Sequence, residues 1–116
     1  MKLLLAEDEA ITGMMLKQTL QGAGYEIVAV VARGSDAITI AKQELIEAMV
    51  MDIRLLDDVD GITAAHEINS GIPVIYCTAY VDPETIARAK QTNPIAILEK
   101  PVNTAALLSH LERLAS

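Results

Sequence analysis

The segment AMVMD, residues 48–52, places four apolar residues directly before a carboxylate and decides the fold class of the chain. Three other segments share this plan of a short apolar run that ends in polar residues: LLLAED (3–8), PVIYCTA (73–79) and AILEKP (96–101). Such runs are typical of strands buried on both faces of a parallel sheet. The polar residues at their ends are Glu7 with Asp8, Asp52, Thr78 and Lys100.

Segments with helical periodicity separate these predicted strands. Ile11, Met14, Met15 and Leu20 fall at the spacing of an apolar helix face, and Gly22 marks the end of that helix. A second helix opens at 34–36, and a third follows the polar loop 57–61 and carries Ile62, Ala65 and Ile68. The segment 25–31 is rich in β-branched residues and predicts one more strand, the second along the chain.

Two further helices have clear start signals. Asp82-Pro83-Glu84 combines an N-cap residue, a proline at the first helical position and an acid in the first turn, and this helix ends near Asn93-Pro94. Asn103 or Thr104 caps the last helix, which carries leucines at 107, 108, 111 and 114. The pattern predicts one α/β domain over residues 1–116, with a doubly wound parallel sheet covered by helices on both faces.

The carboxyl ends of parallel strands lie along one edge of a sheet, so we expect the polar strand ends to converge into a single pocket. Asp52, anchored at a rigid strand end, is placed to attack phosphorus and form an acyl phosphate. Glu7 and Asp8 supply further oxygens for a hard cation, and Mg²⁺ suits such a site. Lys100 offers a positive charge and Thr78 a hydroxyl donor to phosphoryl oxygens.

Composition narrows the possible partners. The net charge of −7 and the absence of a Lys/Arg cluster argue against direct nucleic-acid binding. The apolar stretches are only of strand length, so we expect no membrane span. The first strand begins directly after Met1 and leaves no room for a signal peptide, while Cys77 is expected as a buried thiol in a reducing compartment. These features together predict a cytoplasmic location.

The chain resembles the receiver domains of two-component response regulators, from Lys2 to about Leu114. The matching motifs are AEDE (6–9), MDIRL (51–55), DG (60–61), PVIYCTA (73–79) and EKP (99–101). The resemblance implies a flavodoxin-like fold with five strands in the order 2-1-3-4-5 and five helices. It also implies a signalling module that is not an enzyme, in which Asp52 accepts a phosphoryl group from a sensor histidine kinase or a histidine phosphotransfer protein.

The same resemblance assigns roles within the pocket. Asp8 and Asp52 are expected to bind Mg²⁺ directly, Glu7 through water, and Arg54 through its backbone carbonyl. Thr78 is expected as the switch hydroxyl and Lys100 as the phosphate-binding lysine, with a cis Lys100-Pro101 bond. Phosphorylation is then expected to change the face formed by about Pro83–Ala115, which carries Ile86, Ala89 and Ile95, is short on charge and pairs with a second copy or an effector. No output domain is expected within this chain.

The chain departs from the family pattern at several positions. Ile97 stands where an aromatic residue is usual, which puts the link between Thr78 and the output face in doubt. Leu56 replaces a usual proline in a loop that is one residue longer than is commonest, and Val102 stands where phenylalanine is frequent. Arg54 and Tyr80 flank the pocket at positions that influence how long the aspartyl phosphate lasts in such domains.

Three other functions fit the sequence less well. A phosphorylation-independent interaction module is the main alternative, supported by Ile97. An aspartyl-phosphate hydrolase usually carries a second acid two residues after its nucleophile, but that place holds Arg54 and the chain has no cap domain. Nucleotide binding is disfavoured because neither of the glycine-rich phosphate-binding motifs occurs.

Overall fold

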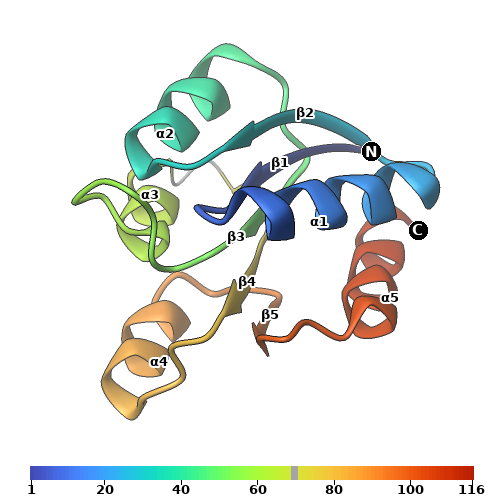
Figure 1. Ribbon diagram of the computed structural model, residues 1–116. Helices are drawn as coiled ribbons and strands as arrows, with labels where there is room; N and C mark the ends of the chain where they lie inside the picture. The colour runs from blue at the N-terminus through green and yellow to red at the C-terminus, as the bar shows by residue number, and fades with distance from the viewer. Residues whose placement is uncertain (69–70) are drawn as a thin grey trace.

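A parallel sheet with strand order β2-β1-β3-β4-β5 forms the centre of the molecule (Figure 1). The computed structural model describes residues 1–68 and 71–116. In this part of the chain the strands are β1 (Lys2–Ala6), β2 (Glu26–Val31), β3 (Ala48–Met51), β4 (Val74–Thr78) and β5 (Ala96–Glu99). The observed strands and their order confirm the flavodoxin-like fold that the resemblance implied.

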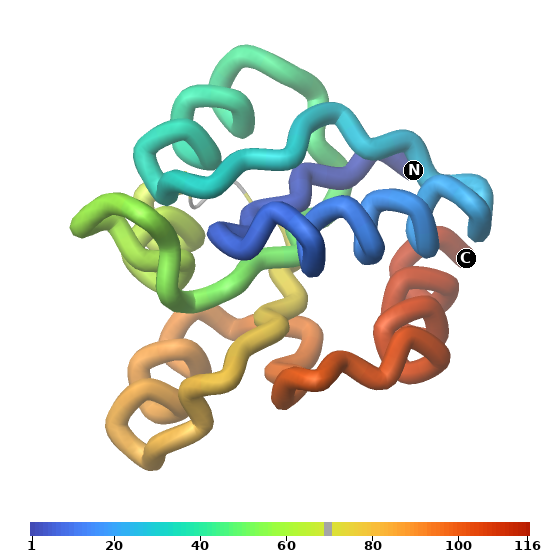
Figure 2. Tube along the Cα trace, viewed as in Figure 1, coloured from blue at the N-terminus to red at the C-terminus, as the bar shows by residue number. Residues whose placement is uncertain are grey.

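Helices cover both faces of the sheet. They are α1 (Ala10–Gly22), α2 (Gly34–Gln43), α3 (Gly61–Ile68), α4 (Pro83–Lys90) and α5 (Thr104–Ala115). The chain steps from β1 to β2 and then reverses toward β3, β4 and β5, so right-handed crossovers put α1 on one face and α2, α3 and α4 on the other. Helix α5 returns to the face of α1, as the tube in Figure 2 also shows.

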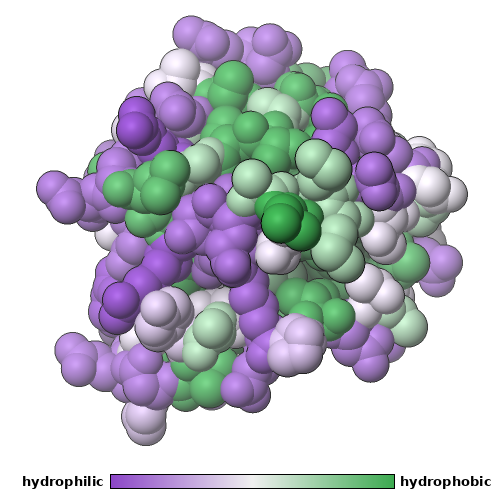
Figure 3. Space-filling view, viewed as in Figure 1, coloured by the Kyte–Doolittle hydropathy of each residue, from purple (hydrophilic) through white to green (hydrophobic). Residues whose placement is uncertain are grey.

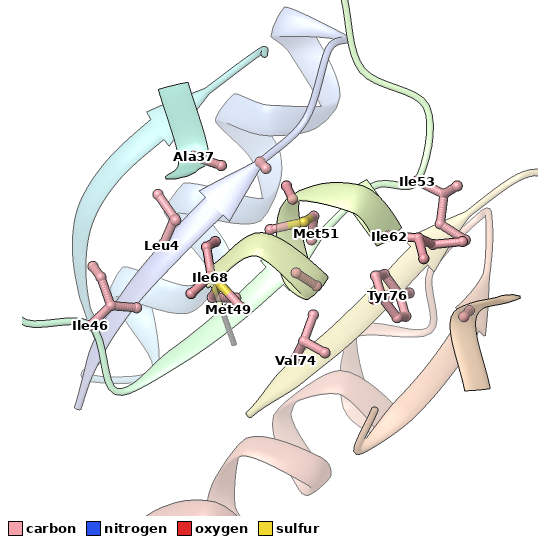
Figure 4. Packing of buried hydrophobic residues seen from close by; sticks show 14 residues of the cluster. Leu4, Ala37, Ile46, Met49, Met51, Ile53, Ile62, Ile68, Val74 and Tyr76 are labelled. Atoms are coloured by element: carbon pink, nitrogen blue, oxygen red, sulfur yellow. The ribbon is translucent and has the colours of Figure 1, made fainter. Parts of the chain in front are cut away.

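Side chains of the central strands alternate between two cores. Leu3, Leu5 and Val50 pack with Leu107 and Leu111 beneath α1 and α5. The alternate residues pack beneath α2, α3 and α4, and Figure 4 shows this second core, with Leu4, Met49, Met51, Val74 and Tyr76 against Ala37, Ile62 and Ile68. Burial on both faces explains why these strands are continuous apolar runs and not alternating ones.

The apolar face predicted for α1 is only partly correct. Leu16 and Leu20 are buried, but Ile11, Met14 and Met15 are 76%, 60% and 63% exposed. Positions 13, 16 and 20 also have helical spacing, and this set faces the sheet. The helix therefore has two apolar stripes, and the outer one contributes to the apolar surface seen over α1 and β2 in Figure 3.

Most helix starts agree with their sequence signals. The Asp82 side chain accepts a hydrogen bond from the Thr85 backbone N–H at 3.1 Å, and Asn103 rather than Thr104 caps α5, accepting from the Ala106 N–H at 3.0 Å. Helix α2 is capped from another segment, because Asp57 accepts from the Gly34 and Ser35 backbone N–H groups at 2.8 and 3.1 Å.

The expected output face needs two corrections. Ala89 lies on the core side of α4, is fully buried and is not part of the surface. The face is also not short on charge, because Lys90 and Glu99 line a groove between α4 and β5 together with Ile86 and Ile97. Within the described residues, no helix combines the length and apolar content that a membrane span requires.

Alanine substitutions test which stripe of α1 is structural. Leu20→Ala is expected to lower the free energy of unfolding by about 2–5 kcal/mol, since it leaves a cavity under the helix. Met14→Ala removes an exposed side chain and is expected to change it by less than about 0.5 kcal/mol. Urea unfolding followed by circular dichroism measures both, and equal losses would contradict the assignment.

Candidate functional site

The candidate site lies at the carboxyl edge of the sheet, where the strand order reverses between β1 and β3. Glu7 and Asp8 follow β1, Asp52 follows β3 and Lys100 follows β5. Two of these residues continue the ladder: the Asp52 N–H donates to the Ala6 carbonyl at 2.8 Å, and the Lys100 N–H donates to the Thr78 carbonyl at 2.9 Å. The backbone at the site is thus held by the sheet itself.

Three carboxylates meet in this pocket. Glu7, Asp8 and Asp52 each place one oxygen within 4.8 Å of the others, and Glu7 and Asp52 are only 4% and 5% exposed. Burial, followed by the hydrogen bond with Asp52, raises the pKa of Glu7 from 4.5 to about 7, although Lys100 acts in the opposite direction. Burial therefore disfavours the ionised form of Glu7, and the three carboxylates need a compensating positive charge to be ionised together.

Lys100 compensates part of this charge. Its Nζ lies 2.5 Å from Glu7 Oε1, 2.8 Å from Asp52 Oδ2 and 3.6 Å from the exposed Glu9. Burial alone would lower the pKa of Lys100, but the hydrogen bonds to Asp52 and Glu7 outweigh it and raise this pKa above its usual value. The ammonium group remains charged in the pocket, as required for binding a phosphoryl group.

One side-chain oxygen of Asp52 lacks a hydrogen-bond partner in the part of the chain that the structure describes. Among the described residues, Oδ1 of Asp52 is the buried side-chain oxygen that accepts no hydrogen bond. Leaving a buried carboxylate oxygen unsatisfied is costly, so this atom is suited to a further ligand. Oxygens from Glu7, Asp8 and Asp52 lie nearby, and an all-oxygen donor set fits a hard cation such as Mg²⁺.

Asp60 and Gly61 connect the loop after Asp52 to the start of α3. Asp60 Oδ1 accepts from the Thr63 N–H at 2.8 Å and so caps α3. A Cβ built on Gly61 would lie 2.0 Å from the backbone carbonyl oxygen of Asp52, which no side chain can occupy. The glycine allows α3 to begin directly against the backbone of Asp52.

Arg54 and Tyr80 line the entrance to the pocket. The Arg54 guanidinium lies 4.0 Å from the centroid of the Tyr80 ring, at cation–π distance. Both residues border a pocket of about 380 Å³, which Asp8, Asp52 and Lys100 also line. The sequence singled out both positions, but their direct contact depends on how the loops after β3 and β4 are folded.

Thr78, unlike Asp8, Asp52 and Lys100, does not line the pocket. It is fully buried, and its hydroxyl accepts a hydrogen bond from the Tyr80 N–H at 3.0 Å. The residues lining the 380 Å³ pocket include its neighbours Ala79 and Tyr80 but not Thr78 itself. In this conformation the hydroxyl is held within the β4–α4 connection.

Two expectations about neighbouring residues agree with the structure. The Lys100-Pro101 peptide bond is cis. Cys77 is a buried free thiol, and burial raises its pKa from 9.0 to about 12. The thiol is therefore protonated near neutral pH and is a core residue.

A flavodoxin-like fold with an acidic pocket and a lysine at the carboxyl edge of its sheet is typical of one class of α/β signalling domains. The model of the response regulator receiver domain matches residues 3–112, so the chain belongs to this family. Receiver domains are in general signalling modules rather than enzymes.

Several known proteins are similar to the chain. It is 34% identical over 113 residues to the transcriptional regulatory protein PdtaR of Mycobacterium tuberculosis, covering 96% of this chain but 55% of PdtaR. The chain thus spans about half the length of this relative. The receiver domain of a modulated diguanylate cyclase from Desulfovibrio desulfuricans has a TM-score of 0.90 at 30% identity, covering 97% and 91% of the two chains.

A second solved structure bears on the acidic cluster. The receiver domain of the sensor histidine kinase PA1611 from Pseudomonas aeruginosa has a TM-score of 0.87 at 29% identity, covering 99% of this chain and 98% of that domain. That protein has a magnesium ion coordinated in its active-site cleft.

The close approach at Gly61 gives a direct test of the site's packing. Gly61→Ala is expected to lower the free energy of unfolding by about 1–3 kcal/mol, because the new methyl group forces the Asp52 backbone and α3 apart. The control is Gly22→Ala at the end of α1, where a Cβ has nothing within 4 Å. Chemical denaturation of both variants is the measurement, and equal stability of the two would contradict this view of the loop.

Proposed function

We propose that the chain is a phospho-acceptor receiver of two-component signalling, in which Asp52 takes a phosphoryl group with the help of Mg²⁺. The observation that carries the proposal is the environment of Asp52: one oxygen is bound by Lys100 and the other is buried without a partner. An Asp52 oxygen would form a bond to phosphorus while the bond between phosphorus and the donor's histidine nitrogen breaks.

The surrounding residues have separate roles in this proposal. Asp8, Asp52 and the backbone carbonyl of Arg54 would hold Mg²⁺, with Glu7 acting through a water molecule. The ion supplies positive charge that offsets the phosphoryl oxygens during transfer. Lys100 would move part of its interaction from Glu7 and Asp52 to the phosphoryl group, and Thr78 would donate its hydroxyl once it leaves the Tyr80 N–H. The magnesium bound in the PA1611 receiver supports this assignment.

The proposed donor is a sensor histidine kinase or a histidine phosphotransfer protein. Such a donor must cover the pocket mouth to bring its histidine to Asp52. A groove of about 520 Å³ between α1 and the start of α5 shares Glu9, Ala79 and Lys100 with the pocket. Met15 lines this groove and Ile11 and Met14 are exposed on the same helix, which offers apolar contacts to a donor protein.

We infer a single receiver domain over residues 1–116, located in the cytoplasm, that contacts neither nucleic acid nor membrane directly. The α4-β5-α5 face would bind a second copy or an effector. A phosphorylation-independent interaction module is the second candidate, favoured by Ile97, which is partly buried where the family usually has an aromatic ring.

Acetyl phosphate tests the proposed chemistry without a cognate donor. With Mg²⁺ present, the parent chain is expected to gain one phosphoryl group, and Asp52→Asn is expected to gain none, because the acceptor oxygen is missing. Intact mass spectrometry records both. If Mg²⁺ binds but the parent gains no mass, the interaction module becomes the preferred function.

The stacked pair at the pocket entrance is expected to slow hydrolysis of the aspartyl phosphate by hindering attack of water. Arg54→Ala and Tyr80→Ala should each raise the dephosphorylation rate by about two- to fivefold, the equivalent of one exposed cation–π contact. Leu56→Ala, an exposed change in the same loop, is the control. Loss of the mass increment over time gives the rates, and unchanged rates in both variants would exclude a shielding role.

A further inference from the structure

Tyr76 is a fully buried tyrosine in β4 whose hydroxyl is bonded to the segment that follows α4. Its oxygen lies 2.8 Å from Thr92 Oγ1, and Thr92 Oγ1 donates to the Ala89 carbonyl at 2.7 Å. A threonine hydroxyl has one hydrogen, and the Ala89 carbonyl can only accept it, so Tyr76 is the donor to Thr92. The chain of bonds runs from β4 through Thr92 to the last turn of α4.

Among the described residues, one other polar side-chain contact joins the last turn of α4 to the rest of the domain. Arg88 and Asp60 form an ion pair at 3.1 Å, but their side chains are 47% and 28% exposed. Exposed ion pairs contribute little because water and salt screen them. The bond between the buried Tyr76 and the partly buried Thr92 is better shielded from water, so it is the more specific constraint on the position of α4.

Tyr76 is also close to the phosphoryl site along β4. Side chains two residues apart in a strand point to the same face, so Tyr76 and Thr78 are neighbours on the face covered by α3 and α4. Figure 4 shows the Tyr76 ring on this side of β4, near Ile62 of α3. Thr78 is fully buried, so it cannot move toward Asp52 without changing the packing beside the ring.

The neighbouring strand leaves room for such a change. Ile97 of β5 pairs in register with Tyr76 and packs against the same core. On its outer side, a groove of about 600 Å³ lies between α4 and β5 and is lined by Ile86, Lys90, Ile97 and Glu99. Among the described residues, helix α4 therefore has open space on one side and, on the other, the partly buried polar link through Thr92.

We propose that Tyr76 is the positioning residue that couples the phosphoryl site to α4, an inference that rests on the proposed function. Movement of Thr78 toward phosphorylated Asp52 changes the packing of the Tyr76 ring. The ring then changes its hydrogen bond to Thr92, and the last turn of α4 is repositioned. In this chain the signal reaches α4 from β4, beside the aliphatic Ile97.

Fluorine NMR observes the ring directly. The chain has three tyrosines, Tyr25, Tyr76 and Tyr80, so 3-fluorotyrosine labelling gives few signals, which single Tyr→Phe variants assign. With Mg²⁺ and acetyl phosphate, the Tyr80 signal is expected to shift because this ring lines the pocket. The Tyr76 signal should shift as well, while the Tyr25 signal stays in place.

Hydrogen exchange of α4 tests whether the bond transmits the change. Phosphorylation is expected to alter amide exchange across α4 in the parent, and Tyr76→Phe and Thr92→Val should lose this response while still gaining one phosphoryl group by mass. Thr92→Ser keeps the hydroxyl and should keep the response, as should Tyr25→Phe.

The outcomes separate the two proposals. A mass gain with an unmoved Tyr76 signal, or with the full α4 response in Tyr76→Phe and Thr92→Val, would overturn the coupling role and leave the phospho-acceptor intact. Absence of a mass gain in the parent overturns the proposed function, and the coupling role with it, because no phosphoryl signal then exists to transmit.

Discussion

The ammonium group of Lys100 lies between two buried carboxylates, and the arrangement of the strand ends depends on this pairing. Glu7 and Asp52 come from β1 and β3, and Lys100 comes from β5, at the far edge of the sheet. Two carboxylates at this depth repel each other unless a positive charge compensates them. Because the bonded residues directly follow three separate strands, the charge pairing also holds the edge of the sheet in one geometry.

The loop after β3 is fixed on both sides by close backbone approaches. Gly61 lies against the Asp52 carbonyl, and a Cβ on Gly34 would lie 2.0 Å from the Val59 carbonyl oxygen. Asp57 adds hydrogen bonds to the start of α2. These contacts explain how a loop that carries an exposed Leu56 is held in place and presents Arg54 at the pocket.

The pocket residues match the family motifs, whereas the residues between the pocket and α4 depart from them at Ile97. Glu7, Asp8, Asp52 and Lys100 meet at the carboxyl edge of the sheet, as the positions of the strand ends predicted. On β5, by contrast, an aliphatic residue is paired with a buried tyrosine on β4, and the polar link to α4 starts from that tyrosine. Ile97 is partly buried and packs against the core that contains the Tyr76 ring, so the two side chains share this volume.

The sequence by itself determined the elements and the sheet edge at which the polar residues meet. Runs such as 48–52 are apolar throughout because central parallel strands are buried on both faces, and their C-terminal ends share one edge by geometry. Local signals also predicted the cap at Asp82 and narrowed the cap of α5 to Asn103 or Thr104. Only the tertiary structure decided contacts between distant segments: the buried stripe of α1, the burial of Ala89, the capping of α2 by Asp57, and the Arg54–Tyr80 and Tyr76–Thr92 pairs. Periodicity gives the spacing of a helix face but not its orientation, since α1 carries two apolar stripes and only packing on the sheet selects one.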